Sequence, residues 1–120
     1  MGKRAIKKQL DAEWKAYQHR VWKRCPVCGE FPVEAHHLIT KRRLTTCWDV
    51  ANGIGLCAKH HRGSEFSPHR TPNAFKEWMR LEYPEQYEWW MASRERVTSS
   101  ISEDWLRRKL KTLRLIARTL

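Results

Sequence analysis

Apolar residues recur at helical spacing near the start of the chain. They are Ile6, Leu10, Trp14, Tyr17 and Val21, at successive steps of 4, 4, 3 and 4 residues. Side chains three and four residues apart lie on one face of a helix. The pattern therefore predicts a helix over residues 4–23 that buries this face and leaves its lysines and arginines largely off it.

The middle of the chain carries shorter patterns. In order, they predict a tight turn over residues 25–29, a strand over 33–39, an exposed basic loop over 41–46 and a second strand over 48–56. Asn52-Gly53 is a turn signal inside or just before the second strand. A helix is expected to begin at Cys57 and to end at Gly63-Ser64.

Three further helical stretches follow residue 70. Thr71-Pro72 has the residue types of an N-cap and a first helical position, and Pro84 restarts the chain after this helix. Ser100-x-x-Glu103 predicts a capping box for the last helix. The apolar positions of these helices are typical of a core: Phe75, Trp78, Met79, Tyr87, Trp90, Met91, Leu106, Leu110 and Leu113.

Together these elements indicate an α+β fold in a single domain over residues 1–120, since chains of this length rarely divide. We expect a basic N-terminal helix (4–23), a small ββα core (25–70) and a helical C-terminal extension (71–120). Cores of this size are marginally stable, and a bound metal would reinforce this one.

The charge is positive and uneven. The chain has a formal net charge of +11, with eight Lys or Arg against two acids in residues 1–24 and six against two in residues 103–120. Residues 75–95 have the opposite balance, three against five glutamates. A concentrated positive charge favours a polyanionic partner such as the nucleic-acid backbone, although a solvated surface has the same composition.

The cysteines are Cys25, Cys28, Cys47 and Cys57. The basic N-terminus is not followed by an apolar stretch, and no apolar run approaches membrane-spanning length, so we expect a soluble, cytoplasmic protein without a membrane partner. In such a chain the Cys-x-x-Cys pair indicates a metal site rather than disulfides.

Two pairs of ligand residues have matching spacing. Cys25 and Cys28 are three residues apart, and so are Cys57 and His60. Together they would form a closed tetrahedral site for a structural Zn²⁺. Cys47 in place of His60 is the alternative fourth ligand, and we prefer His60 because its spacing repeats that of the first pair.

The remaining histidines include the doublet His36-His37, which lies in the first predicted strand. Adjacent strand residues point to opposite faces, so His36 and His37 should have different roles. His61 directly follows a zinc ligand and should point away from the zinc, where a second metal could be bound.

These residues resemble a known family. The runs Ala35-His36-His37-Leu38-Ile39, Asn52-Gly53-Ile54-x-Leu56-Cys57 and His60-His61 are similar to the HNH endonuclease, or ββα-metal, signature. The preceding Cys-x-x-Cys places the resemblance with the zinc-knuckle branch of phage and prophage nucleases. It covers residues 25–69.

The resemblance implies a role for each position. His37 would be the general base that activates water, and Asn52 would brace the loop and help to orient this base. His36 and His61 would bind one catalytic divalent ion, and His69 is a further candidate ligand. Because His36 stands where many relatives have aspartate, Mn²⁺, Ni²⁺ or Zn²⁺ would be tolerated beside Mg²⁺.

The implied reaction is hydrolysis of DNA phosphodiester bonds to 3′-hydroxyl and 5′-phosphate ends. Lys41, Arg42, Arg43 and Arg62 would contact phosphates, and both termini would lie along flanking DNA. The leucine spacing in residues 106–113 permits a homodimer, and a phage packaging or recombination partner is compatible with the family. A non-catalytic zinc-stabilised DNA-binding module is the alternative, followed by an RNA-directed protein.

Overall fold

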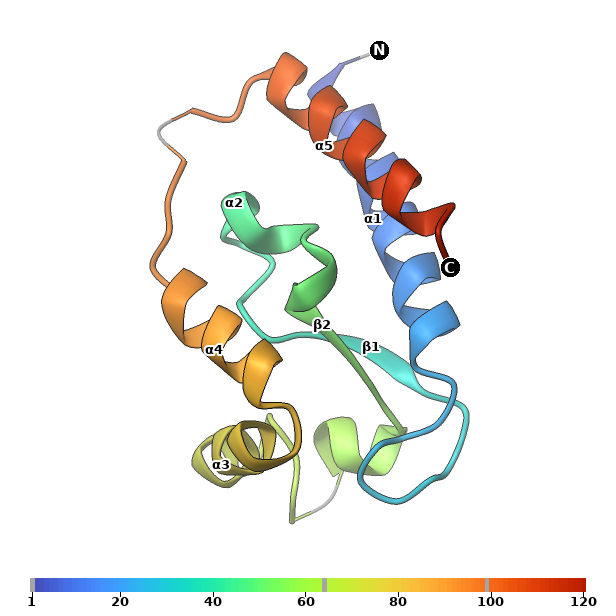
Figure 1. Ribbon diagram of the computed structural model, residues 1–120, viewed down its shortest axis with the longest axis vertical. Helices are drawn as coiled ribbons and strands as arrows, with labels where there is room; N and C mark the ends of the chain where they lie inside the picture. Colours follow the sequence, from blue (N-terminus) through green and yellow to red (C-terminus); the bar gives the residue numbers. More distant parts are fainter. Residues whose placement is uncertain (1, 64, 99) are drawn as a thin grey trace.

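The first helix begins one residue before the predicted start, ends two residues before the predicted end, and buries a slightly different face. The computed structural model describes residues 2–63, 65–98 and 100–120, and its helix α1 spans Lys3–Val21 (Figure 1). Ile6, Leu10 and Trp14 are buried as expected. The fourth buried residue is Gln18, whereas Val21 is 45% exposed. The buried residues Ile6, Leu10, Trp14 and Gln18 therefore follow one another at steps of four residues. Gln18 can be buried because its Nε2 donates a hydrogen bond to the Val50 carbonyl at 2.9 Å.

The predicted strand pair is present in shortened form. Strand β1 (Glu34–His37) pairs antiparallel with β2 (Gly53–Leu56), so that His37 lies opposite Gly53 and His36 opposite Ile54. The prediction that the second strand begins at residue 48 is wrong. Trp48 caps a short helix, and Val50–Asn52 form a 3-10 turn, η1.

The basic loop is also shorter than predicted. Only residues 41–43 are exposed, because Leu44–Cys47 form helix α2 and bury Thr46 and Cys47. The buried side chain of Asn52 explains the change of path. Its Nδ2 donates to the carbonyls of Ile39 and Thr46 at 3.1 Å, and its Oδ1 accepts from Ile39 N at 2.6 Å.

The helix expected after Cys57 is a single π-helical turn, η2 (Lys59–Gly63). Its predicted end at Gly63-Ser64 falls in part on Ser64, which is outside the described residues.

Helices α3 (Pro72–Glu82), α4 (Pro84–Ser93) and α5 (Glu103–Ala117) confirm the C-terminal helical pattern. The capping box at Ser100 is wrong. Ser102 caps α5 instead, its Oγ accepting from Trp105 N at 3.0 Å.

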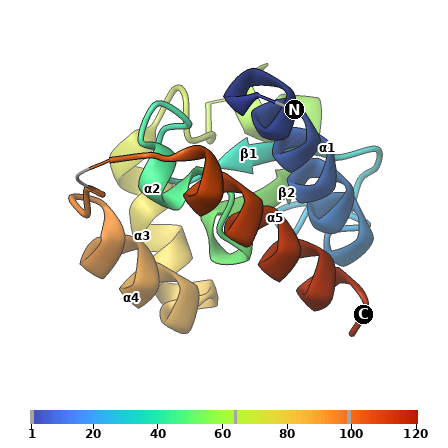
Figure 2. The ribbon, with the colours of Figure 1, turned by 90° about the horizontal axis from the view of Figure 1, so that it is seen from above.

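The two-stranded sheet lies between two pairs of helices. Helix α5 runs beside α1, and α3 and α4 lie on the other side of the sheet (Figures 1 and 2). Each pair has its own apolar cluster. The cluster of α3 and α4 includes Phe75, Met79 and Trp90 together with Ile54 and Leu56 of the sheet, and the cluster of α1 and α5 includes Ile6, Leu10, Trp14, Leu106, Leu110 and Leu113. An ion pair between Lys109 and Asp49 joins α5 to the residues just before β2.

The structure is thus a mixed α+β fold, as expected. Among residues 2–63, 65–98 and 100–120, no helix is both long and apolar enough to cross a bilayer.

Candidate metal centres

Three cysteines and one histidine come together at the end of the sheet where β2 ends. The turn after α1 supplies Cys25 and Cys28, and the chain leaving β2 supplies Cys57 and His60. Their ligand atoms all lie within 4.8 Å of one another. The Sγ atoms of Cys28 and Cys57 are 3.7 Å apart, and Nδ1 of His60 is 3.4 Å from Cys57 Sγ and 3.9 Å from Cys25 Sγ.

These separations suit a tetrahedral zinc ion. With Zn–S bonds of about 2.3 Å, the ligands of a tetrahedron are about 3.8 Å apart. The local backbone is shaped for it. Gly29 has a φ of +80°, and Gly29 N donates to the Cys25 carbonyl at 2.7 Å, which closes the turn that carries both sulfurs. The four residues therefore form a group that can hold a metal such as zinc.

Cys47 is not part of this group. Its Sγ lies 3.8 Å from Nε2 of His37, and burial raises the pKa of its thiol to about 12. A thiol that stays protonated is a poor zinc ligand. The structure thus brings His60 together with Cys25, Cys28 and Cys57, and places Cys47, the alternative fourth ligand, outside this group.

A second cluster consists of His36 on β1, His61 on η2 and His69 before α3. Nε2 of His61 lies 3.2 Å from Nδ1 of His36 and 3.3 Å from Nε2 of His69. Burial, together with the charges that His61 and His69 would carry, lowers the pKa of His36 to about 3. His36 is therefore neutral near pH 7 and has a lone pair available for a metal.

Glu34 orients this cluster and was missing from the sequence-based prediction. Nδ1 of His61 donates to Glu34 Oε1 at 2.7 Å, which directs Nε2 of His61 toward the other two histidines. The same hydrogen bond is the main cause that lowers the pKa of Glu34. Glu34 lies two positions before His36, and strand residues two apart share a face, so the alternation contained a signal for it.

His37 points to the other face of β1, as the strand geometry predicts. Its ring stacks on Trp14 of α1, with centroids 3.8 Å apart and planes at 9°. Its Nε2 lies 3.1 Å from the Cys47 carbonyl. A carbonyl only accepts, so Nε2 carries the hydrogen and Nδ1 keeps a free lone pair. Burial lowers the pKa of His37, so its neutral form prevails near pH 7.

Asn52 is fully buried between the chain that follows β1 and helix α2. Through the hydrogen bonds to Ile39 and Thr46 it ties the residues after β1 to α2, whose last residue, Cys47, supplies the carbonyl that binds His37. The contact between Asn52 and the histidine is therefore indirect.

One open pocket of about 540 Å³ joins the histidines. It is lined by His36, His37, His61 and His69, together with Lys41, Arg62 and Lys76. Lys41 and Arg62 are predicted phosphate contacts, whereas the exposed Arg42 and Arg43 are not part of the lining. Lys76 was not predicted. It lies on α3, outside the part of the sequence that carries the resemblance.

Comparisons of the chain with protein-family models, with curated proteins and with solved structures give no match.

Proposed function

We propose that this protein is a metal-dependent endonuclease of the HNH type that hydrolyses DNA phosphodiester bonds. The observation that carries the proposal is the shared pocket. Three histidines with converging nitrogens line the same pocket as His37, whose Nε2 is bound by the Cys47 carbonyl.

His36, His61 and His69 would hold the catalytic divalent ion. Neutral imidazoles without a carboxylate suit Mn²⁺, Ni²⁺ or Zn²⁺ at least as well as Mg²⁺. The ion would offset the negative charge that develops on the phosphate and on the departing 3′ oxygen. Glu34 fixes the tautomer of His61, so that its Nε2 is the nitrogen available to a metal.

His37 would act as the general base. Its Nδ1 accepts a proton from water, while the Cys47 carbonyl stabilises the hydrogen on Nε2. The Cys47 carbonyl would stabilise the positive charge of the resulting imidazolium. The indole face of Trp14, stacked on the ring, would stabilise it further through a cation–π interaction.

Lys41, Arg62 and Lys76 surround the pocket with positive charge and would position the scissile phosphate. Arg62 is held by the Glu34 carboxylate at 3.4 Å, so it is already directed toward this side of the site. The products would be a 3′-hydroxyl and a 5′-phosphate. The zinc knuckle would have a structural role, fixing η2 and with it His61.

The test is relaxation of supercoiled plasmid by purified protein with no added metal and with Mg²⁺, Mn²⁺ or Ni²⁺. Wild type is compared with His61→Ala and with His19→Ala, which removes an exposed histidine on α1. Metal-dependent nicking that is lost in His61→Ala and kept in His19→Ala supports the proposal. Salt-sensitive DNA binding without cleavage under any metal would replace it with the non-catalytic DNA-binding module.

A further inference from the structure

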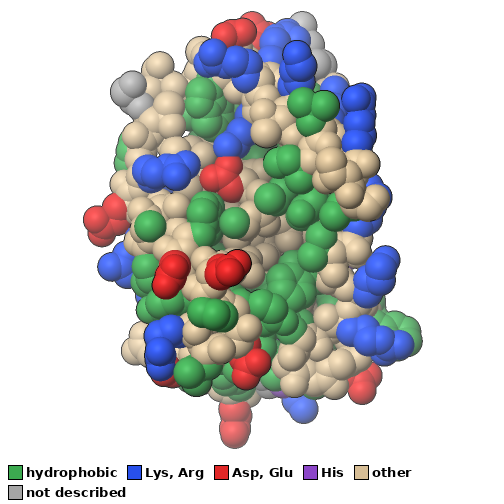
Figure 3. Space-filling model, viewed as in Figure 1, with side chains coloured by type: hydrophobic (Ala, Val, Ile, Leu, Met, Phe, Trp, Pro, Cys, Tyr) green, Lys and Arg blue, Asp and Glu red, His purple; other side chains and the backbone are tan. Residues whose placement is uncertain are grey.

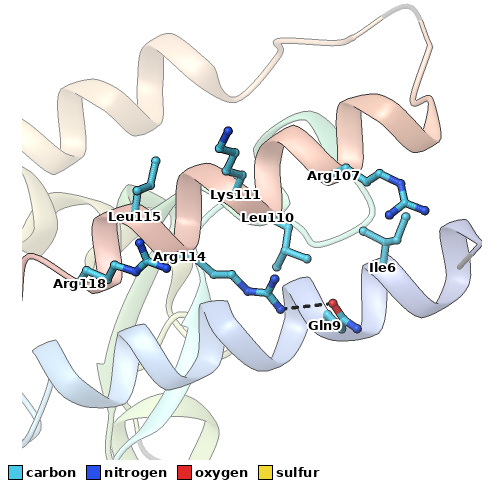
Figure 4. Close-up of a pocket in the computed structure, with 8 residues that line it drawn as sticks. All are labelled: Ile6, Gln9, Arg107, Leu110, Lys111, Arg114, Leu115 and Arg118. Carbon is cyan, nitrogen blue, oxygen red and sulfur yellow. Dashed lines mark hydrogen bonds between the residues drawn. The ribbon is translucent and has the colours of Figure 1, made fainter.

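A basic trough runs along the junction of α1 and α5, away from the histidine pocket. Two hollows, of about 390 and 340 Å³, both include Arg114 and Arg118 in their walls and therefore adjoin. Neither shares a residue with the histidine pocket. Figure 4 shows the residues that line the larger hollow, with Arg114 reaching from α5 toward Gln9 of α1 and Lys111 pointing away from α1 in this view.

Cationic side chains outnumber acidic ones in the walls of the trough, which also contain the apolar Ile6, Leu110 and Leu115. The basic side chains are Arg20, Arg107, Lys111, Arg114 and Arg118, and the acidic side chain among the described lining residues is Glu13. Arg107, Lys111 and Arg114 of α5 and its C-cap residue, Arg118, follow one another at steps of 4, 3 and 4 residues, which places them on one face of the helix. Figure 3 shows Lys and Arg side chains gathered along the edge of the molecule that carries α1 and α5.

The trough is held in shape by the rest of the fold. The neighbouring face of α5 buries Leu106, Leu110 and Leu113 against the core, and Leu110 also lines the larger hollow. Nη1 of Arg20 donates to the Ala117 carbonyl at 3.2 Å, and Nη2 of Arg114 donates to Oε1 of Gln9 at 3.3 Å, as drawn in Figure 4. Both contacts bridge the two helices.

Two of its cations are available to a ligand. Lys111 and Arg118 are exposed, and within residues 2–63, 65–98 and 100–120 neither side chain has an acidic partner. An unpaired cation can bind an anionic ligand without first breaking an ion pair, so its cost is limited to ordering and desolvating the side chain. Arg114, by contrast, already pairs with Glu13.

We propose that the trough between α1 and α5 binds the phosphate backbone of duplex DNA that flanks the cleaved bond. This inference rests on the proposed function for the nature of its ligand. From Arg107 to Arg118 the helix rises about 16 Å, which is the axial length of about five nucleotides in one strand. A row of cations along this length matches a repeating anion better than it matches a single small ligand.

A lipid surface fits less well. A helix that lies on a bilayer inserts its apolar face into the acyl region. In α5 this face is buried against α1 and is not available.

The experiment compares two double variants of the full-length chain with the same change in net charge. Lys111→Gln with Arg118→Gln removes the unpaired cations of the trough. Arg80→Gln with Arg94→Gln is the control and removes two exposed cations from the helical region 75–95. Both variants are first checked for wild-type circular dichroism, melting temperature and zinc content.

Binding to a short labelled duplex is then measured by fluorescence anisotropy, without added divalent metal, between about 50 and 200 mM salt. In the trough variant, the loss of two phosphate contacts should make the negative slope of log K against log salt shallower by about 1.8. It should also weaken DNA binding by on the order of tenfold. The control should stay close to wild type. Sedimentation with anionic vesicles is measured in parallel.

Equal affinities and slopes for the trough variant and wild type would overturn the inference. So would equal losses in the trough variant and the control, which would indicate net charge alone, or vesicle binding that depends on the trough when DNA binding does not. Because binding is read without cleavage, the two proposals fail separately. A trough-dependent binder that cleaves under no metal would refute the endonuclease and leave the trough as a DNA contact.

Discussion

The indole of Trp14 stacks on the imidazole of His37 at 3.8 Å and 9°, across 23 residues of sequence. Helix α1 lies outside the segment that resembles the HNH signature, yet it forms one wall around the proposed general base. Trp14 is itself fixed, since its Nε1 donates to the Asp49 carbonyl at 3.0 Å. The orientation of His37 therefore depends on two elements, α1 through the stack and α2 through the Cys47 carbonyl.

Replacing Trp14 should change the pH dependence of cleavage as well as its rate. Burial lowers the pKa of His37, so Trp14→Leu, which opens one side of the ring to water, should raise this pKa toward its ordinary value. The base would then be protonated up to a higher pH, so the acid limb of the plot of kcat against pH should shift to higher pH. Trp14→Phe should restore the limb in part.

Leu106→Ala is the matched control, because Leu106 belongs to the same apolar cluster as Trp14. It should destabilise the fold by about 2–5 kcal/mol without moving the acid limb. An acid limb that shifts equally in both variants would assign Trp14 a purely structural role.

Glu34→Gln should weaken metal binding at the three-histidine cluster. The carboxylate that accepts from His61 Nδ1 at 2.7 Å would be replaced by a neutral amide that no longer fixes one tautomer. Loss of such an outer ligand contact typically lowers metal affinity by about 10–100-fold. Calorimetric titration with Ni²⁺ measures the change. Glu88→Gln, at an exposed position on α4, should bind as wild type does, and an unchanged affinity in Glu34→Gln would argue against the cluster as a metal site.

Cys25→Ser should abolish zinc binding and folding together. Structural zinc contributes on the order of 10 kcal/mol to small domains, which is comparable with their whole stability. Metal analysis and near-UV circular dichroism read the two losses. Cys47→Ser should retain one zinc, since Cys47 lies beside His37 and away from the four-ligand group. Zinc lost from the Cys47 variant and kept in the Cys25 variant would reverse the assignment.

Acid should destabilise the fold through His36. Its pKa is about 3 in the folded chain and near 6.5 when unfolded, so the unfolded chain binds the extra proton between these values. The free energy of unfolding should therefore fall as pH drops from about 6.5 toward 3, by about 1.4 kcal/mol per unit for this group. Urea unfolding at several pH values measures the slope. His36→Gln should flatten it and His19→Gln should not; equal slopes in all three proteins would contradict the burial of His36.

The sequence predicted the features that local spacing determines. Cys25 with Cys28, and Cys57 with His60, are each three residues apart, and one turn of chain is enough to bring either pair together. The opposite orientation of His36 and His37 follows from the alternation of a strand alone.

Features that depend on distant contacts were not predictable in this way. The second strand starts at Gly53 rather than residue 48 because the Asn52 amide binds backbone groups of Ile39 and Thr46, and neither contact has a local signature. The Trp14–His37 stack and the pairing of α1 with α5 join residues that are far apart in the sequence. The cap of α5 at Ser102 instead of Ser100 shows how two equivalent residue types leave a helix start uncertain by one half-turn.

The central claim is that His37 activates water beside a metal held by the other histidines, and single-turnover cleavage by His37→Ala tests it most directly. The variant should first be shown to bind zinc and Ni²⁺ in the same amounts as wild type. We predict that its cleavage rate then falls by about 10²–10⁴-fold, because a positioned general base contributes this much. Wild-type cleavage by a fully metal-loaded His37→Ala protein would contradict the account.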